Sequence, residues 1–458
     1  MSGFRNVSRG AQGLTPGCRV PLRFPLLPIF LILCATGTSA QDFAVAGARI
    51  FDGSQVIENG SVVVRDGRIA AVGKSVELPE GVEVVDGTGK TLLPGWIDCH
   101  THSWGDALER DPVFGVTTVL DMFTEPGWAA ERRKEQAEGK ADGRADLFSA
   151  GFLATAPGGH GTQYGIEVPT LTAADQAEDW VAARVAEGSD YVKIIIEDGS
   201  LWGRPLPSLD EPIVRAVAAA ARAHGRLAVA HVTTLAKAEV ALDAGVDGLV
   251  HLFRDAEAPP EWVAEVARRK LFVVPTLTVV ESTAGIASGT SLVDDPRLAP
   301  FLRSAEIANL KQSFPAGKAS MEAAYATLRA LDEAGVRILA GSDAPNPGTA
   351  HGASLHRELE LLVEAGLAPA TVLAAATATA AEVFGLDDRG KIEPGRRADL
   401  LLVEGNPLDE ITATRAIVTV WKGGREIERP RVEADASRPK YGPGPLADFD
   451  DIELRKQP

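Results

Sequence analysis

The chain has 458 residues, of which 45% are hydrophobic and 24% charged, enough apolar material for one large core and a smaller second one. This composition excludes disorder as the main state of the chain. The formal net charge of -17 argues against binding to a nucleic-acid backbone, because like charges repel.

The first 40 residues have the pattern of an export signal. Four arginines and no acidic residue accompany an apolar stretch, PLLPIFLILCATGTSA, which ends in small residues. Cleavage before Gln41 would give a periplasmic or secreted protein with no membrane span after signal cleavage. Two alternatives stay open. One is a membrane anchor, for which the uncharged core is short, and the other is a lipoprotein attached at Cys34, where Leu33 is an unfavourable preceding residue.

Signal cleavage would also determine which cysteines remain in the mature chain. It would remove Cys18 and Cys34 and leave Cys99 as the last cysteine of the chain. No disulfide could then form within the mature chain, even in an oxidising compartment. We therefore expect the hydrophobic core to hold the fold.

Two strand-rich segments flank a long middle segment. Residues 41–93 contain short runs of Val, Ile and Leu separated by turn residues, and the same texture returns in residues 390–430. These two pieces predict one small composite β-sandwich domain built from both chain ends. The tail of residues 431–458 is rich in Pro, Gly and acidic residues, and we expect it to be irregular.

Between these pieces, residues 94–389 alternate eight apolar runs with helical patterns. The helical patterns carry caps, as in residues 211–225, where Pro212 lies in the first turn and Gly225 follows the end. Eight strand-helix units over about 290 residues predict an α/β fold, a parallel (β/α)8 TIM barrel. A doubly wound open sheet is the alternative, but no Gly-rich phosphate loop follows the first strand. The runs are GWIDCH, VTTVLDM, FSAGFLAT, YVKIII, LAVAHV, GLVHLF, FVVPTLTVV and RILAGSD.

Residues 281–336 are longer than a single crossover helix requires. We therefore predict a helical insertion in this part of the barrel, placed where it could cover the barrel mouth.

Polar side chains interrupt or end these apolar runs. His100 and His102 have the same parity at the end of the first run, so both should face the barrel axis. Alone, this pair indicates either a two-imidazole metal chelate or two hydrogen-bonded core histidines. Further polar residues fall at or near the carboxyl ends of later strands, the face where such barrels build active sites. Buried in apolar strands they need one another or an ion, and a divalent metal cluster would satisfy them together. They are Lys193, His231, His251 and Asp343.

The motifs GWIDCHTH, YVKI, AHV, VHLF and AGSD, with the later GKIEPGRRADLLL, resemble those of the amidohydrolase superfamily. Within it, the chain is most similar to the branch of imidazolonepropionase-like proteins and Xaa-Pro dipeptidases with a carboxylated lysine. The resemblance implies that His100, His102 and Asp343 hold one divalent metal ion. It also implies that His231 and His251 hold a second.

The resemblance further implies that Lys193 bridges the two ions as a carbamate formed with carbon dioxide. A protonated lysine has only donors, whereas its carbamate offers two anionic oxygens as ligands. The alternative is an ordinary barrel-interior lysine paired with Asp343. Zinc is the expected metal, and Mn2+, Co2+ or Fe2+ would also fit. Asp343 would take a proton from a water acidified by the ions and pass it to the leaving nitrogen.

Loops after the strands supply candidate substrate contacts. His160 and Tyr164 lie in the stretch ATAPGGHGTQYG after the third strand. His160 should hydrogen-bond the developing oxyanion or the substrate carbonyl, the alternative being a loop histidine in water. Arg204, in the loop after the fourth strand, could pair with a substrate carboxylate or remain a solvated charge. In the loop after the eighth strand, His351 is predicted to reach the pocket.

The sequence therefore predicts an exported binuclear metal-dependent amidohydrolase. It would hydrolyse an amide, peptide-like or cyclic amide carbon-nitrogen bond of a small molecule such as a dipeptide, an N-acyl amino acid or a ring amide. One alternative is the same site acting on ester, lactone or carbamate bonds. Another is a noncatalytic binding relative, although all the ligand positions are filled. The partner would be a small-molecule substrate rather than a nucleic acid, and the sequence leaves a monomer and a homo-oligomer both open.

Overall fold

The computed structural model describes residues 41–203, 205–315, 317 and 319–432. The predicted signal peptide and residues 433–458 of the predicted tail lie outside the described residues, as does Arg204. Within the described ranges, no helix combines the length and the apolar character that crossing a membrane would require.

Eight parallel strands form two sheets in the middle of the chain. All pairings within both sheets are parallel, and nearly all residues of these strands are buried. The three-stranded sheet contains β6 (Trp96–Thr101), β7 (Val116–Asp121) and β8 (Asp146–Ser149). The five-stranded sheet contains β9 (Val192–Ile195), β10 (Ala228–His231), β11 (Gly248–Leu249), β12 (Phe272–Val273) and β13 (Arg337–Ile338).

Backbone bridges join these two sheets at both edges. Beyond the end of β8, Ala154 pairs in parallel with Ile194 of β9, and beyond the end of β13, Ala344 pairs in parallel with Thr101 of β6. At the second junction the His102 amide also donates a hydrogen bond to the Ala344 carbonyl, at 2.8 Å. The strands thus follow one another in a TIM-barrel-like α/β arrangement.

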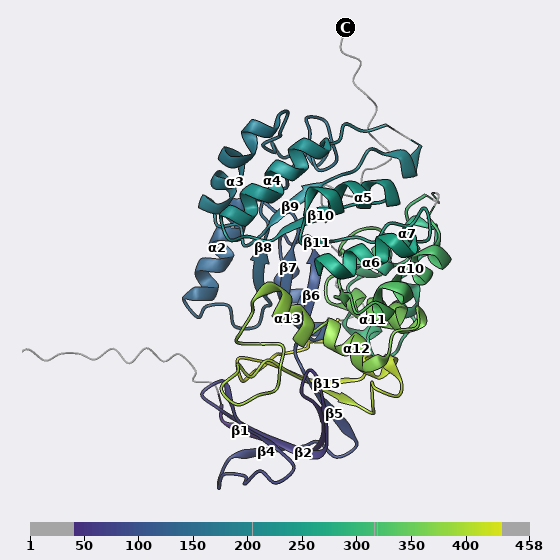
Figure 1. Cartoon of the computed structure of the whole chain (residues 1–458). Helices are drawn as coiled ribbons and strands as arrows, with labels where there is room; N and C mark the ends of the chain where they lie inside the picture. The colour runs from purple at the N-terminus through teal and green to yellow at the C-terminus, as the bar shows by residue number, and fades with distance from the viewer. Residues whose placement is uncertain (1–40, 204, 316, 318, 433–458) are drawn as a thin grey trace, which may run out of the picture. The chain divides into compact units, whose positions relative to one another are not determined.

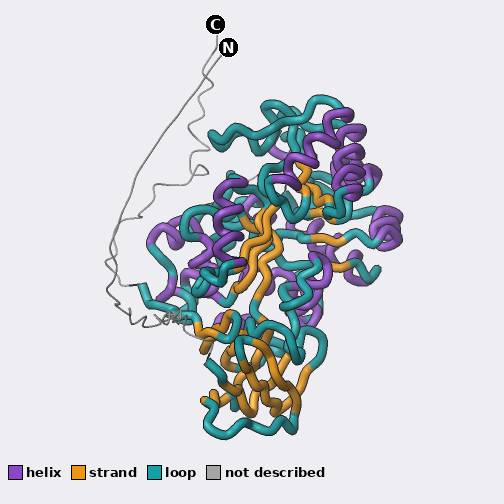
Figure 2. Tube along the Cα trace, turned by 90° about the vertical axis from the view of Figure 1, so that its left-hand side faces the viewer, coloured by secondary structure: helices purple, strands orange, loops and turns teal. Residues whose placement is uncertain are grey.

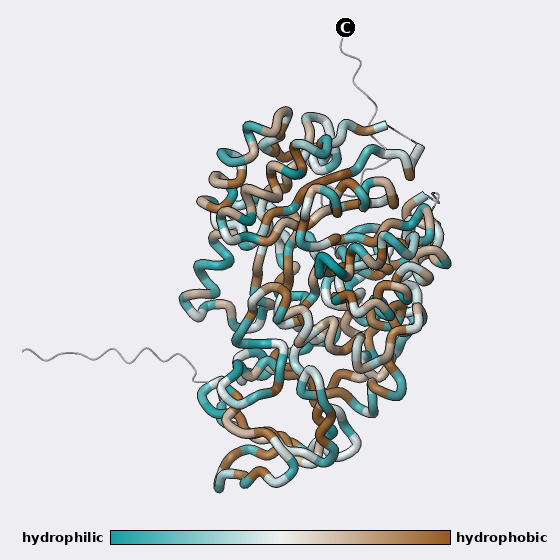
Figure 3. Tube along the Cα trace, in the orientation of Figure 1, coloured by the Kyte–Doolittle hydropathy of each residue, from teal (hydrophilic) through white to brown (hydrophobic). Residues whose placement is uncertain are grey.

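Helices alternate with these strands and surround them (Figures 1 and 2). In α4 the Asp210 carboxylate caps the first turn by accepting from the Ile213 amide, and the apolar side of the helix packs against the strands. The apolar colour in Figure 3 follows the central strands in the same way. The helices around the strands are α1 (Ala107–Arg110), α2 (Pro126–Ala137), α3 (Ala177–Ala186), α4 (Glu211–Ala223), α5 (Leu235–Ala244), α6 (Pro260–Arg269), α10 (Met321–Glu333), α11 (Ala353–Glu364), α12 (Pro369–Ala375) and α13 (Ala378–Phe384).

The seventh apolar run, FVVPTLTVV, is a strand only at its start. β12 ends at Val273, and α7 (Leu277–Thr283) occupies the second half of the run, so the prediction of a strand over the whole run is wrong there. Pro275 has no amide hydrogen to continue the ladder, and Thr276 turns the chain with φ 51°.

The segment predicted as a helical insertion consists of short helices. After α7 come α8 (Thr290–Val293) and α9 (Ser304–Leu310), and α10 then leads to β13. Buried leucines of this segment, including Leu292 and Leu310, pack in one cluster with Phe114.

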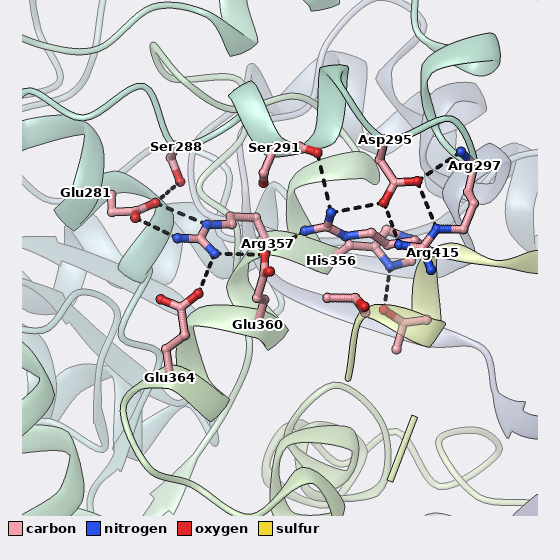
Figure 4. Close-up of polar contacts among 12 residues, drawn as sticks. Glu281, Ser288, Ser291, Asp295, Arg297, His356, Arg357, Glu360, Glu364 and Arg415 are labelled. Carbon is pink, nitrogen blue, oxygen red and sulfur yellow. Dashed lines mark hydrogen bonds and ion pairs between the residues drawn. The ribbon is translucent and has the colours of Figure 1, made fainter. Parts of the chain in front are cut away.

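Charged side chains fasten this segment to α11 and to the 3-10 turn η5 (Ile411–Arg415) (Figure 4). Arg357 of α11 lies 2.7 Å from Glu281, while Arg415 lies 3.1 Å from Asp295 and 2.6 Å from Glu360. All five side chains are at least four-fifths buried, so the pairs are shielded from solvent.

The small domain is composite, because strands from both ends of the chain pair with each other. β14 lies antiparallel to β5 over five residue pairs. All eight strands belong to one hydrogen-bonded sheet, and Val45, Leu92, Leu402 and Trp421 share its core. The strands are β1 (Phe43–Phe51), β2 (Val56–Arg65), β3 (Arg68–Gly73), β4 (Glu83–Asp86), β5 (Lys90–Pro94), β14 (Leu400–Glu404), β15 (Ile417–Lys422) and β16 (Arg425–Glu426).

Candidate active site

The six residues predicted as metal ligands lie together: Lys193 is inside β9, and the other five are near or beyond the carboxyl ends of their strands. Asp343 Oδ1 is 3.3 Å from His100 Nε2 and 3.0 Å from His102 Nε2. The other oxygen of Asp343, Oδ2, is 3.8 Å from His251 Nδ1. Lys193 Nζ lies 3.2 Å from His100 Nε2. Five side chains from four separate parts of the sequence therefore face one another.

His231 completes this group from the end of β10. Its ring centroid lies 4.4 Å from that of His251 and 4.9 Å from that of His160. Nε2 of His231 is 3.7 Å from Glu197 Oε2. Glu197 is itself buried and accepts hydrogen bonds from the Thr233 hydroxyl and, at 2.5 Å, from a backbone amide. From its place just beyond the strand, the sequence leaves open whether the Glu197 side chain is solvated or supports a ligand residue.

Close packing between β6 and the chain beyond β13 positions His100 and Asp343. Asp98, one residue pair deeper in β6, accepts hydrogen bonds from Ser342 N at 3.0 Å and Ser342 Oγ at 2.6 Å. A Cβ atom on Gly341 would lie only 2.8 Å from His100 Cβ, so a larger residue would not fit here. Asp343 adopts φ 51°, an uncommon left-handed conformation that is often found at functional sites.

The buried donor atoms of this group fit a divalent metal. His231 Nε2 and Asp343 Oδ1 are buried and have no hydrogen-bond partner among the described residues. Burial lowers the pKa of His100 and His251 well below the usual value, which keeps their imidazoles neutral. Ligand atoms of His100, His251 and Asp343 lie within 4.8 Å of one another. Neutral imidazoles and a carboxylate are the donors that zinc and similar ions bind.

Lys193 is the one amine in this group and is 2% exposed. Burial lowers its pKa to about 8, while the nearby Asp343 and Asp121 carboxylates act in the opposite direction. The Asp121 carboxylate is held by the Ser103 amide at 2.5 Å and the Ser149 hydroxyl at 2.8 Å. These contacts keep a negative charge near Lys193.

A cavity of about 960 Å³ opens onto these residues. His160 and Tyr164 both line it, as predicted from their loop. His160 Nδ1 lies 3.3 Å from Gln163 Nε2, and burial, followed by the neighbouring His231, lowers the pKa of His160 to about 3. His160 is therefore neutral at physiological pH. The remaining walls are largely apolar and include Trp104, Phe123, Trp128, Leu153, Ile166, Ile195, Leu206, Val279, Phe314 and Pro315.

Two predicted substrate contacts do not appear in this cavity. Arg204 lies outside the described residues. His351 is not among the residues that line the cavity: its Nδ1 is 3.9 Å from the buried Asp111 carboxylate, and its ring lies 6.4 Å from that of Trp104. Sequence reasoning missed Arg254, a buried lining residue that directly follows the VHLF motif, and its position after a strand was the available signal.

Comparison with known proteins agrees with this geometry. Residues 91–427 match the amidohydrolase family, and residues 43–92 match the NagA composite domain. The chain belongs to the amidohydrolase family. It is accordingly a metal-dependent hydrolase that acts on carbon-nitrogen bonds, and the resemblance seen in the sequence motifs is confirmed.

Individual relatives cover most of this amidohydrolase. It is 28% identical over 387 residues to an imidazolonepropionase of Geobacillus sp. (strain WCH70), covering 76% of this chain and 84% of that protein. Its structure is similar to that of a putative prolidase from Bifidobacterium longum, with 26% identity, a TM-score of 0.67 and coverage of 86% and 96%. A Xaa-Pro dipeptidase structure at 24% identity, with a TM-score of 0.67 and coverage of 85% and 100%, shows the same fold.

Proposed function

We propose that this amidohydrolase is an exported binuclear enzyme that cleaves an amide, peptide-like or cyclic amide bond in a small molecule carrying an apolar or aromatic group. The proposal rests on one observation. Six side chains of the types that bind metals, from the ends or neighbourhoods of five strands, converge beside an apolar cavity. We also propose that the strands close into a (β/α)8 barrel and that the small domain is a β-sandwich. The proposed location is periplasmic or secreted, as the N-terminal pattern predicts.

In this proposal His100, His102 and Asp343 hold one ion, and His231 and His251 hold the second. The distances of 3.0 Å and 3.3 Å from Asp343 Oδ1 to the first two imidazoles support the first set. The distance of 4.4 Å between the ring centroids of His231 and His251 supports the second set. Zn2+ suits these ligands best, with Mn2+, Co2+ or Fe2+ also compatible.

Lys193 would bridge the two sets as a carbamate. The ammonium would first lose one proton to solvent; Nζ would then bond to the carbon of carbon dioxide as one carbon-oxygen π bond opens, and a second proton would leave, so that a donor becomes a carbamate with two oxygens that share one negative charge. The burial of Lys193 between Val192 and Ile194, and its distance of 3.2 Å from His100 Nε2, support this role. An unmodified Lys193 ammonium this close to His100 Nε2 would instead repel a metal ion bound by that nitrogen.

The reaction would then depend on proton handling by this chain's own side chains. When bound, the ions would acidify a water molecule and polarise the scissile carbonyl. Asp343, whose Oδ1 is buried and has no hydrogen-bond partner in the described part of the chain, would take the proton from the attacking water and pass it to the leaving nitrogen. Neutral His160, on the cavity wall, would donate a hydrogen bond to the developing oxyanion.

The cavity walls support the substrate class. Aromatic rings of Trp104, Phe123, Trp128 and Tyr164 line one continuous space together with the proposed ligands. Such walls bury an apolar acyl or ring group and exclude water from the reacting bond. Dipeptides, N-acyl amino acids and ring amides with a bulky apolar part are therefore the proposed substrates, with Arg204 as a further proposed contact for a substrate carboxylate.

Metal analysis together with a substrate screen tests this function. Purified protein should contain close to two divalent ions per chain, chelation should abolish hydrolysis, and added Zn2+ should restore it. The screen should compare dipeptides, N-acyl amino acids, ring amides, lactones and aryl esters, with products identified by mass. Full activity in metal-free protein would contradict the mechanism, and turnover of esters alone would contradict the bond assignment.

Export is tested separately from catalysis. The protein isolated from its native host should begin at Gln41 and should be found outside the cytoplasm. A chain that retains residues 1–40 in the cytoplasm would contradict export and leave the chemistry of the site unchanged.

A further inference from the structure

Thr276 is a fully buried residue between β12 and α7, and its hydroxyl contacts His251 of the candidate site. Oγ1 lies 2.7 Å from His251 Nδ1 and 2.8 Å from the carbonyl oxygen of Pro275. The backbone of Thr276 has φ 51° and ψ 51°, a left-handed conformation that is rare for a β-branched residue. Such a strained conformation costs free energy, and it is found where the surrounding structure requires it.

The hydroxyl of Thr276 is not needed to begin the helix. A threonine before a helix usually caps it by accepting from an amide of the first turn, but the Thr276 side chain makes no such bond. The Glu358 carboxylate does this instead, accepting from the Leu277 amide at 3.0 Å and the Thr278 amide at 2.9 Å. Thr276 Oγ1 is therefore committed to His251 and to the Pro275 carbonyl.

One arrangement of hydrogens satisfies both contacts of this hydroxyl. The Pro275 carbonyl can only accept, so the single hydroxyl hydrogen of Thr276 is donated there. The contact with His251 is then a hydrogen bond only if Nδ1 carries the imidazole hydrogen and donates it to Oγ1. With the opposite assignment, two oxygen atoms would face each other at 2.8 Å without a hydrogen between them.

The hydrogen on Nδ1 decides what the other ring nitrogen can do. A neutral imidazole with its hydrogen on Nδ1 has its lone pair on Nε2. Asp343 Oδ2 lies 3.8 Å from Nδ1, which is too far to compete for the hydrogen bond.

We propose that Thr276 is a positioning residue that fixes the tautomer and the ring orientation of His251, so that Nε2 presents its lone pair to the metal centre. The inference rests on the proposed role of His251 as a metal ligand. Thr276 is not among the residues that line the cavity, so we expect no contact between it and substrate. Its effect is exerted on the metal, as for other groups that hydrogen-bond the second nitrogen of a ligating histidine.

The test measures metal affinity in full-length protein carrying Thr276→Val or Thr276→Ser. Valine keeps the shape and the β-branch but removes the hydroxyl, whereas serine keeps the hydroxyl. Zn2+ affinity, measured by competition with a chromogenic chelator, should fall by about 10- to 100-fold for one of the two ions in Thr276→Val. In Thr276→Ser it should stay within about threefold. Wild-type affinity in Thr276→Val would overturn the proposal.

Thr327→Val is the matched control. Thr327 is also fully buried, and its Oγ1 accepts a hydrogen bond from the Ala258 amide at 2.9 Å, away from the proposed ligands. This variant loses a buried hydroxyl and should keep wild-type Zn2+ affinity. An equal loss of affinity in both variants would show that Thr276 acts only through the general packing of the fold.

A second measurement works even if Thr276→Val does not fold. In metal-free wild-type protein labelled with 15N-histidine, His251 should show the shifts of an imidazole with its hydrogen on Nδ1. The opposite tautomer would overturn the proposal. His251→Ala separates this result from the proposed function, because unchanged metal content in that variant would remove His251 from the ligand set and leave the tautomer assignment standing.

Discussion

Replacing Asp146 with asparagine should weaken the attachment of the small sheet to the barrel strands. Asp146 is the first residue of β8 and is 1% exposed. Its Oδ2 lies 2.8 Å from Arg389 Nη1, its Oδ1 lies 2.6 Å from Lys422 Nζ, and the Arg397 guanidinium also contacts it. The two arginines precede β14 and the lysine ends β15, so one carboxylate ties a barrel strand to the small domain.

The charge of Asp146 sets the size of the expected effect. Burial alone would raise its pKa, but Arg397, Lys422 and Arg389 together bring the pKa well below the usual value. Asparagine would leave buried cations without this counter-charge, a change that costs about 3–5 kcal/mol. For a folded part of roughly 390 residues, the unfolding entropy is about 0.8 kcal/mol/K. The midpoint of thermal unfolding should therefore fall by about 4–6 °C.

The dependence on pH follows from the lowered pKa. A carboxylate with a folded-state pKa below its unfolded value contributes stability that is fully present above the unfolded pKa, about 3.9 for aspartate. This contribution is lost as the pH falls through the lower, folded-state value. The difference between wild-type protein and Asp146→Asn should thus be constant near neutral pH and shrink only in strong acid.

Calorimetry and circular dichroism at pH 7 measure the effect, with Asp388→Asn as the control. Asp388 lies 2.8 Å from Nε of the same Arg389, but its side chain is 42% exposed. Removing an exposed partner should cost less than about 1 kcal/mol. If Asp146→Asn unfolds within about 1 °C of the wild type, or if both variants lose equal stability, buried charge compensation is not what holds this junction.

Three further substitutions address the site itself. Lys193→Ala should lose most bound metal and activity, and added formate or acetate should partly restore both, since they supply the missing oxygens; unchanged metal content would exclude a bridging role. His160→Ala should lower turnover by about 10²- to 10³-fold with metal content kept, and normal turnover would make His160 an ordinary loop residue. Gly341→Ala would place a Cβ atom 2.5 Å from Val274 Cγ1 and 2.8 Å from His100 Cβ, so both metal content and the unfolding temperature should fall. Wild-type metal content and a wild-type unfolding temperature would show that the strands can move apart without loss of metal binding or stability.

The sequence predicted those features that depend on local patterns. The helix expected in residues 211–225 is α4. It could be predicted because its capping residues and its periodic apolar residues lie close together in the sequence. His100 and His102 could be placed on one side of β6 because side chains alternate along any strand. Asp98 has the same parity as His100 and lies deeper in β6, where it accepts hydrogen bonds from Ser342.

Features that depend on distant residues left no local signal. The start of α7 relies on Glu358, which lies 81 positions after Leu277, so the second half of FVVPTLTVV reads as a strand in isolation. Glu197 turns inward because the Thr233 hydroxyl and His231 meet it there. The direction of His351 is likewise set by its contacts across the fold and not by the composition of its loop.

The site is assembled across the junction between the two parallel sheets. His100 and His102 come from the three-stranded sheet, whereas Lys193 belongs to the five-stranded sheet. Asp343 follows the last strand of that sheet, and its amide donates to the His100 carbonyl at 2.7 Å. The junction therefore brings the two groups of candidate ligands within bonding distance of each other. Because a metal held by both groups would bind the folded arrangement and not the unfolded chain, its binding free energy would oppose any opening of this junction.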